Sequence, residues 1–177
     1  MKNYVKTLTI ATSAALAIVP GAAWAGSAPK GNLVAAAVSS KDHQTLVAAV
    51  KAAGLVDTLA GSGPFTVFAP TDAAFARLPA GTVNTLLQPA NRDQLRAVLT
   101  YHVVPGAVTS AKLIEAIRMG QGTATLKTVQ GGTITARLSG DSVVILDAAG
   151  GTATVTKADL IQSNGVIHVT DAVSLPM

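Results

Sequence analysis

The stretch that decides the fold reads Lys157-Ala-Asp-Leu-Ile-Gln-Ser-Asn-Gly-Val-Ile-His-Val-Thr-Asp-Ala-Val-Ser-Leu-Pro176. It has a short polar lead-in, and after Asn164-Gly165 it continues as an apolar strand. Val166, Ile167 and Val169 are β-branched, and such side chains suit a half-buried pleated surface. Asn-Gly is typical of a tight turn whose two central residues both have positive φ. We therefore expect a left-handed turn followed by a strand.

Two earlier blocks have equally definite patterns. The first is Thr66-Val-Phe-Ala-Pro-Thr-Asp-Ala-Ala-Phe75, and the second is Leu99-Thr-Tyr-His-Val-Val-Pro-Gly106. In the first block a compact strand over residues 65–68 stops at a proline, and Thr71 can cap a helix over residues 72–78. In the second block a helix gives way to a short strand that ends at Pro-Gly.

The three blocks resemble the signatures of the fasciclin (FAS1) domain family, in the same order and at similar spacing. The resemblance runs from about Asn32 to Pro176. It implies an α+β fold, with a fasciclin-like β-sheet wedge and several α-helices packed along one side. It also implies a non-catalytic adhesion or interaction module of the secreted, bacterial, single-domain type.

The periodicity of the remaining sequence agrees with an α+β layout, because helical patterns come first and alternating patterns follow. Helices are predicted over residues 32–38, 42–53, 55–59, 72–78, 81–88, 92–100 and 110–119. Strands are predicted over residues 101–104, 125–129, 133–138, 142–147 and 152–156. Gly54 stands where a left-handed helix C-cap is expected.

The N-terminal residues 1–25 have the pattern of a cleaved secretory signal peptide. Lys2 and Lys6 precede an apolar run from Leu8 to Val19, and Ala23-Trp24-Ala25 is a typical cleavage site. We expect a flexible tail over residues 26–31 and a single domain over residues 32–177. The protein would then be exported, to the periplasm or the extracellular medium, without stable membrane insertion.

Composition excludes several classes of function. The formal net charge is +4, and removal of the leader with its two lysines lowers it to about +2, without a basic cluster. Aromatic residues make up 3% of the chain, too few for platforms that stack bases. We therefore expect no nucleic-acid partner. The chain has no cysteine, so its stability rests on packing.

The sequence motifs do not indicate a catalytic site or a cofactor site. His43, His102 and His168 are far apart, with no second ligand at a metal-binding spacing. No Gly-x-Ser-x-Gly elbow is present, and Gly61-Ser62-Gly63 precedes a strand, which is the wrong context for one. The Gly-Gly pairs lack the Lys-Ser/Thr of a phosphate loop. We expect no enzyme activity, no cofactor and no metal.

Tyr101-His102 has two interpretations. The structural one is that the Tyr101 ring packs while its hydroxyl finds a partner and His102 bonds nearby backbone. The functional one, implied by the family resemblance, is that Tyr-His belongs to an adhesion surface. The structural interpretation is favoured, because a helix-to-strand junction is usually architectural.

Asp159-Leu160 corresponds in position to an Asp-Ile pair that is implicated in integrin contact in animal matrix members of the family. In the structural interpretation Asp159 caps a turn and Leu160 packs in the core; in the functional one the pair contacts a partner, and the two remain equally weighted. The preferred hypothesis is a module whose Asp159, Leu160, Tyr101 and His102 bind a cell-surface or matrix protein or glycan, as a monomer. The alternative is an exported carrier of a small apolar ligand.

Overall fold

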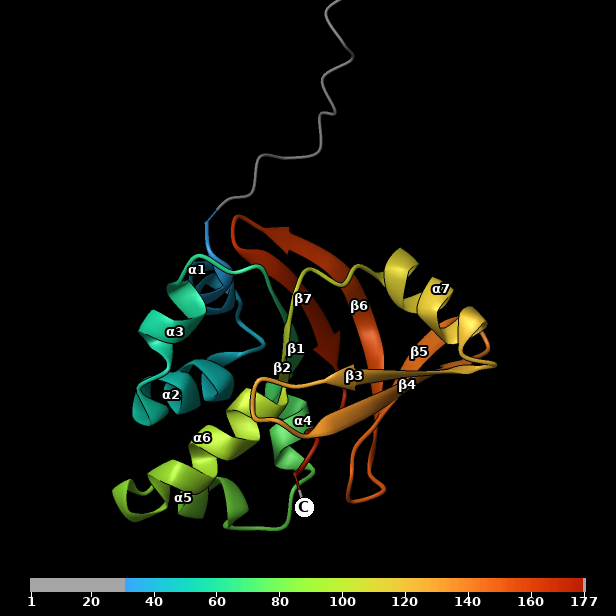
Figure 1. Cartoon of the computed structure of the whole chain (residues 1–177). Helices are drawn as coiled ribbons and strands as arrows, with labels where there is room; N and C mark the ends of the chain where they lie inside the picture. Colours follow the sequence, from blue (N-terminus) through green and yellow to red (C-terminus); the bar gives the residue numbers. More distant parts are fainter. Residues whose placement is uncertain (1–30, 177) are drawn as a thin grey trace, which may run out of the picture.

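The computed structural model describes residues 31–176, which form a mixed α+β fold around one sheet (Figure 1). The sheet order is β2-β1-β7-β6-β5-β4-β3. Only β1 and β7 are parallel among these pairs, and the other neighbours are antiparallel. The strands are β1 (Phe65–Pro70), β2 (Val103–Pro105), β3 (Thr123–Lys127), β4 (Thr133–Ser139), β5 (Ser142–Leu146), β6 (Thr152–Gln162) and β7 (Gly165–Thr170).

The two ends of the sheet approach each other. The backbone N–H of Val129, just after β3, donates to the carbonyl oxygen of Val103 in β2 at 2.8 Å. The N–H of Gln130 donates to the carbonyl oxygen of Thr100 at 3.3 Å. These bonds nearly close the sheet, which satisfies part of an edge that would otherwise be exposed to pairing with other chains.

Most of the helices lie on one side of the sheet, as predicted, but the last one does not (Figure 1). That helix, α7, packs against β3 and β4 at the opposite end. No helix in residues 31–176 is long and apolar enough to cross a membrane. The helices are α1 (Leu33–Ser39), α2 (Gln44–Ala53), α3 (Val56–Ala60), α4 (Asp72–Ala76), α5 (Thr82–Leu86), the 3₁₀ turn η1 (Pro89–Asn91), α6 (Arg92–Tyr101) and α7 (Ser110–Met119).

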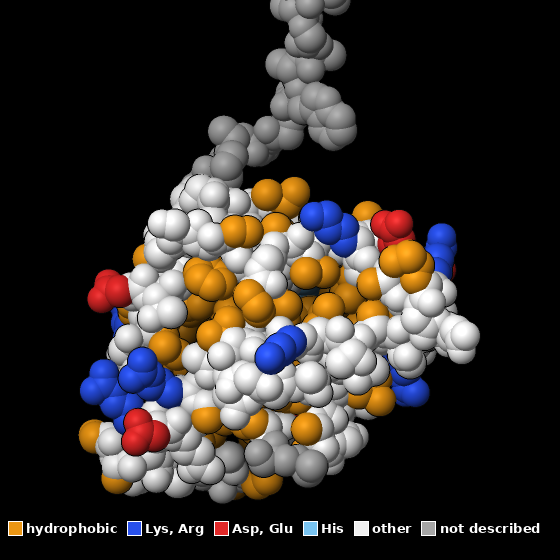
Figure 2. All heavy atoms as spheres, viewed as in Figure 1, with side chains coloured by type: hydrophobic (Ala, Val, Ile, Leu, Met, Phe, Trp, Pro, Cys, Tyr) orange, Lys and Arg blue, Asp and Glu red, His pale blue; other side chains and the backbone are white. Residues whose placement is uncertain are grey.

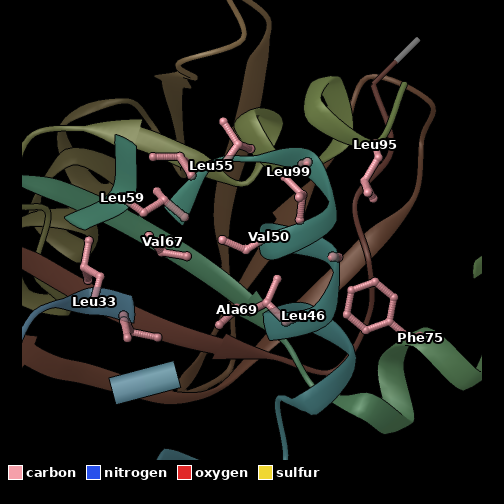
Figure 3. Packing of buried hydrophobic residues seen from close by; sticks show 14 of the residues in the cluster. Leu33, Leu46, Val50, Leu55, Leu59, Val67, Ala69, Phe75, Leu95 and Leu99 are labelled. Carbon is pink, nitrogen blue, oxygen red and sulfur yellow. The ribbon is translucent and has the colours of Figure 1, made fainter. Parts of the chain in front are cut away.

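Two apolar cores hold these layers together. The first lies between the helices and β1, β2 and β7, and Figure 3 shows Leu46 and Val50 of α2 pointing toward Val67 and Ala69 of β1. The second lies between α7 and strands β3 to β6, around Leu113, and also includes Phe68 of β1. Alternate residues of β1 therefore contribute to different cores, as the two-residue period of a strand requires.

Several local predictions are confirmed. Gly54 has φ +68° at the C-terminus of α2, and the Thr71 hydroxyl accepts the N–H of Ala74 at the start of α4. The predicted strand over residues 101–104 is wrong in its first half, because α6 continues through Tyr101 and its C-cap is His102. The predicted strand over residues 152–156 is too short, since β6 runs on to Gln162. The signal peptide and residues 26–30 of the tail lie outside the described residues.

The predicted left-handed Asn164-Gly165 turn is wrong. The turn consists of Ser163 and Asn164, Gly165 is the first residue of β7, and none of these three residues has positive φ. Glycine is needed for a different reason. A Cβ at Gly165 would overlap the carbonyl oxygen of Phe65, because β1 and β7 pair at this point.

Replacement of Gly165 by valine tests this explanation. We expect a loss of about 3 kcal/mol or more, because the overlapping atom is backbone and cannot move aside. Gly140→Ala is the matched control: Gly140 has φ +62° with open space around it, so only the left-handed backbone penalty of about 1–2 kcal/mol applies. Urea unfolding of both variants measures the difference. Equal losses would contradict the steric explanation.

Candidate functional site

Asp159 lies at an irregular point of β6, where the register with β7 shifts. Its backbone has φ +58°, an uncommon value for a residue other than glycine. The side chain is half-buried, and its carboxylate accepts the N–H of Ser110 at 2.7 Å and also the Ser110 hydroxyl. Asp159 therefore supplies negative charge to the N-terminus of α7, where the helix dipole favours it.

Leu160 and Ile161 follow immediately and are exposed, by 40% and 60% of their surface. The interpretation that Leu160 packs in the core is wrong. Strand β5 pairs with β6 only at residues 152–154. Among the described strands, residues 157–162 of β6 therefore have β7 as their one neighbour. Apolar side chains reach the surface at this end of the molecule, near the point where the described chain begins (Figure 2).

Tyr101 is buried, with 1% of its surface exposed. Its hydroxyl donates to the carbonyl oxygen of Thr133 at 2.8 Å and accepts the N–H of Ala148 at 3.0 Å. Burial raises the pKa of Tyr101. These bonds join the end of α6 to the start of β4 and the end of β5, which is the structural role considered for this residue.

His102 is also buried, at 4% exposure. Its Nε2 lies 3.0 Å from the backbone nitrogen of Ser174, and its Nδ1 lies 2.8 Å from the carbonyl oxygen of Val98. An N–H can only donate and a carbonyl can only accept, so Nε2 accepts and Nδ1 carries the proton. Burial lowers the pKa of His102, which favours this neutral form.

The four predicted contact residues therefore fall into two separate groups. Tyr101 and His102 are inside the domain at the end of α6, whereas Asp159 and Leu160 are at the surface end of β6. No hydrogen bond among the described residues links the two groups. Only the Asp159 group, extended by Ile161, presents side chains to the outside.

His168 lies between Ile167 and Val169 in β7, so its side chain is on the opposite face of the strand from theirs. It is buried, at 1% exposure, and its ring stacks on Phe68 at 5.5 Å between centroids. Its Nε2 lies 2.8 Å from the Val108 carbonyl oxygen, and its Nδ1 lies 3.4 Å from the Asp159 nitrogen. It therefore holds the loop before α7 and the irregular part of β6.

Ser110, Asp159 and His168 have the composition of a hydrolase triad but not its hydrogen bonds. The Ser110 hydroxyl donates to the Asp159 carboxylate, while both ring nitrogens of His168 meet backbone atoms. A triad requires the serine to bond the imidazole so that it can lose its proton. Within residues 31–176, no three His, Asp or Glu side chains are grouped so that they could hold a metal ion.

Asn164 has a role that the sequence analysis missed. Its Oδ1 accepts the N–H of Leu33 at 2.8 Å, and its Nδ2 donates to the carbonyl oxygens of Leu59 and Gly61 at 2.8 and 2.9 Å. One side chain thus joins the start of α1, the end of α3 and the start of β7. The Asn-Gly pair was assigned to turn geometry, and nothing local in the sequence indicates these distant partners.

Asp72 has a similar remote role. Its carboxylate accepts the N–H groups of Thr45 at 2.7 Å and Gln44 at 3.2 Å, at the start of α2. Burial opposes ionisation, but the hydrogen bonds from Thr45 and Gln44 together lower the pKa of Asp72. The stability that these bonds contribute is therefore present above pH 3.8 and is lost as the pH falls below that value.

Comparison with known proteins agrees with this architecture. A family model described as the fasciclin domain matches residues 41–176. The chain therefore belongs to the fasciclin family. Protein sll1483 of Synechocystis sp. is 47% identical over 144 residues, which are 81% of this chain and 73% of that protein. Immunogenic protein MPB70 of Mycobacterium bovis is 35% identical over 146 residues, 80% of this chain and 67% of that protein.

A solved structure of a fasciclin-domain pair, from the insect cell adhesion molecule Fasciclin I, has the same fold. Its TM-score is 0.73 with 19% identity, and the match covers 82% of this chain and 51% of that one. Fasciclin domains are not a catalytic family. The structural roles of Tyr101, His102, Asp159 and His168 are consistent with that.

Asn164→Asp tests the role of the amide in this fasciclin domain. The new oxygen faces the carbonyl oxygens of Leu59 and Gly61, so we expect a loss of about 2–4 kcal/mol at pH 7. A protonated Asp can donate again, which raises its folded pKa, so the loss should shrink as the pH falls toward 4. Urea unfolding at both pH values measures it. Asn164→Ala is the control, whose deficit should not shrink in this way, and wild-type stability of Asn164→Asp at pH 7 would contradict the assignment.

Proposed function

We propose that this fasciclin domain is an exported interaction module that binds a cell-surface or extracellular matrix protein or glycan. The observation that carries the proposal is the exposed Leu160-Ile161 pair at the end of β6. The similarity to a domain pair from an insect cell adhesion molecule supports the same class of function. The leader-like residues 1–25 support export, to the periplasm or beyond.

The contact surface that we propose consists of Leu160 and Ile161, with Asp159 as the residue that fixes its shape. Two adjacent side chains in a regular strand point to opposite faces, yet here both are exposed, at the irregular end of the strand. Apolar residues that remain exposed beside a rigid scaffold are typical of binding surfaces. Tyr101 and His102 would support binding only indirectly, through the fold.

Substitution of the apolar pair tests the surface. In a pull-down from host envelope and culture medium, we expect the Leu160→Thr, Ile161→Thr double variant to bind a captured partner at least about tenfold more weakly, because central apolar contacts dominate such interfaces. Threonine is β-branched, as a strand prefers, so both substitutions suit the backbone of β6. Asp159→Ala is less suitable, since it also removes a cap of α7.

Val129→Thr is the matched control, because Val129 is 42% exposed at a different place, after β3. Thermal unfolding should show that both variants are folded. Unchanged binding by the double variant would refute the proposed surface. No partner captured by the wild-type protein would favour the second candidate instead.

A carrier of a small apolar ligand is the second candidate, and one observation favours it. A cavity of about 40 Å³ lies between α1, α2, α3 and the strands β1 and β7, lined almost entirely by apolar side chains such as Leu33 and Ile167. Ligand sites are typically about 300–1,000 Å³. A ligand would therefore have to part the helices from the sheet.

Native mass spectrometry of protein purified from its host tests the carrier. A retained ligand would appear as an added mass, and Ala37→Leu, which places a larger side chain in the cavity lining, should remove it. A bare mass for the wild-type protein would count against a carrier function.

A further inference from the structure

The C-terminal segment, residues 174–176, is held by acceptors that belong to other parts of the domain. The N–H of Ser174 donates to Nε2 of His102 at 3.0 Å, and the N–H of Leu175 donates to Oδ2 of Asp147 at 2.9 Å. Before this segment, Asp171 is held independently by Thr154 and Arg77. Ala172 is joined to β7, because the Thr170 hydroxyl donates to its carbonyl oxygen at 3.1 Å, and Ala172 and Val173 pack against the two apolar cores. The bonds to His102 and Asp147 therefore form a separate attachment for residues 174–176 alone.

Only one protonation state of His102 fits this attachment. Nδ1 must carry the proton that is donated to the Val98 carbonyl oxygen, so Nε2 must be bare to accept from Ser174. A second proton on Nε2 would face the N–H of Ser174 directly. It would also place a positive charge inside the domain, at a residue with 4% exposure.

We propose that His102 is an acid-sensitive latch, and that its protonation at Nε2 releases residues 174–176 while the rest of the domain stays folded. The segment is separable because it lies outside the sheet, beyond the end of β7. The device is independent of the proposed contact surface at Leu160-Ile161.

The groups around His102 do not offer an alternative acceptor for the proton. The backbone N–H of Phe68 in β1 donates to the His102 carbonyl oxygen at 2.9 Å and offers no acceptor. Lys51 of α2 and His102 both line the small cavity between the helices and the sheet, and Lys51 carries a positive charge, as protonated His102 would. The carboxylate of Asp147, just after β5, favours the charged form of His102. Its two oxygens already accept the N–H groups of Gly151 and Leu175, so they are not free to accept a proton from His102.

Release would open a space of mixed polar and apolar lining. Leu175 and Pro176 form one wall of this space of about 350 Å³, and the other walls come from α5, α6 and Gln130 after β3. Leu86 of α5 and Val98 of α6 lie in these walls. Release would remove the wall formed by Leu175 and Pro176 and leave the space open to solvent on that side.

The pH range in which the segment is released follows from the difference between the pKa of His102 in the attached and in the released state. Released His102 regains an ordinary pKa of 6.5, whereas burial in the attached state lowers its pKa. Attachment is therefore strongest above pH 6.5. As the pH falls below 6.5, the equilibrium constant for release rises by up to about tenfold per pH unit, because release takes up one proton.

A spin label at the end of the segment tests the latch. The chain has no cysteine, so Pro176→Cys in the full chain gives a single site for a nitroxide. We expect its electron paramagnetic resonance spectrum to change from immobile at pH 7.5 to mobile at pH 5, while far-UV circular dichroism stays native. A label that stays immobile at pH 5, or that becomes mobile only together with global unfolding, would overturn the proposal.

Three further variants identify the group responsible. His102→Gln keeps an acceptor but cannot titrate, so the label should lose its response between pH 7.5 and 5. Ser174→Pro removes the donated N–H and should leave the label mobile at both pH values, whereas Ser174→Ala keeps the N–H and should behave as wild type. If His102→Gln fails to fold, the Ser174 pair still decides the question. A full pH response in Ser174→Pro, or in a folded His102→Gln, would assign the release to another group.

Discussion

The parallel pairing of β1 with β7 is the constraint on which the rest of the structure depends. It joins residues 65–70 to residues 165–170, so about 100 residues must be arranged before the pair can close. Such closure has a cost in chain entropy that contacts between residues close in sequence cannot offset. Burial of every residue of β7 supplies the compensation. Both cores include residues of β1, and Gly165 permits the close approach of the two backbones.

Remote capping then fixes the helices on this sheet. Asp72 accepts the first N–H groups of α2, Asp159 accepts that of α7, and Asn164 accepts that of α1. Each of these bonds satisfies a donor that a helix cannot satisfy internally. Each also spans at least 27 positions in the sequence, so it ties tertiary structure to helix formation. The polar residues of the signature blocks are therefore mainly structural.

The sequence predicts features whose causes are local. The helix over residues 110–119 follows from the helical period of its apolar residues. The Thr71 cap and the left-handed Gly54 follow from groups close to them in the sequence. The strands of the sheet follow from a two-residue period. The family resemblance supplies the overall α+β architecture. Errors occur where a distant partner decides the outcome. Asn164-Gly165 has the composition of a positive-φ turn, but β1 and three helix-end groups determine its geometry.

The same distinction explains why the candidate site could be predicted only in part. Position along the chain identifies Asp159-Leu160 and Tyr101-His102, but burial separates them, and burial depends on contacts that the sequence does not display. His102 is inside because the segment after β7 folds back over α6, and Leu160 is outside because β5 ends its pairing before that part of β6.

An irregular strand links this architecture to the proposed function. Asp159, with φ +58°, turns its carboxylate toward α7, and the register with β7 shifts between Lys157 and Leu160. A bulge of this kind re-aims the side chains that follow it and discourages pairing along a sheet edge. The residue that stabilises α7 is thus also the one that leaves Leu160 and Ile161 outside. A family signature can therefore be retained for folding, while the binding that we propose would depend on the two apolar side chains beside it.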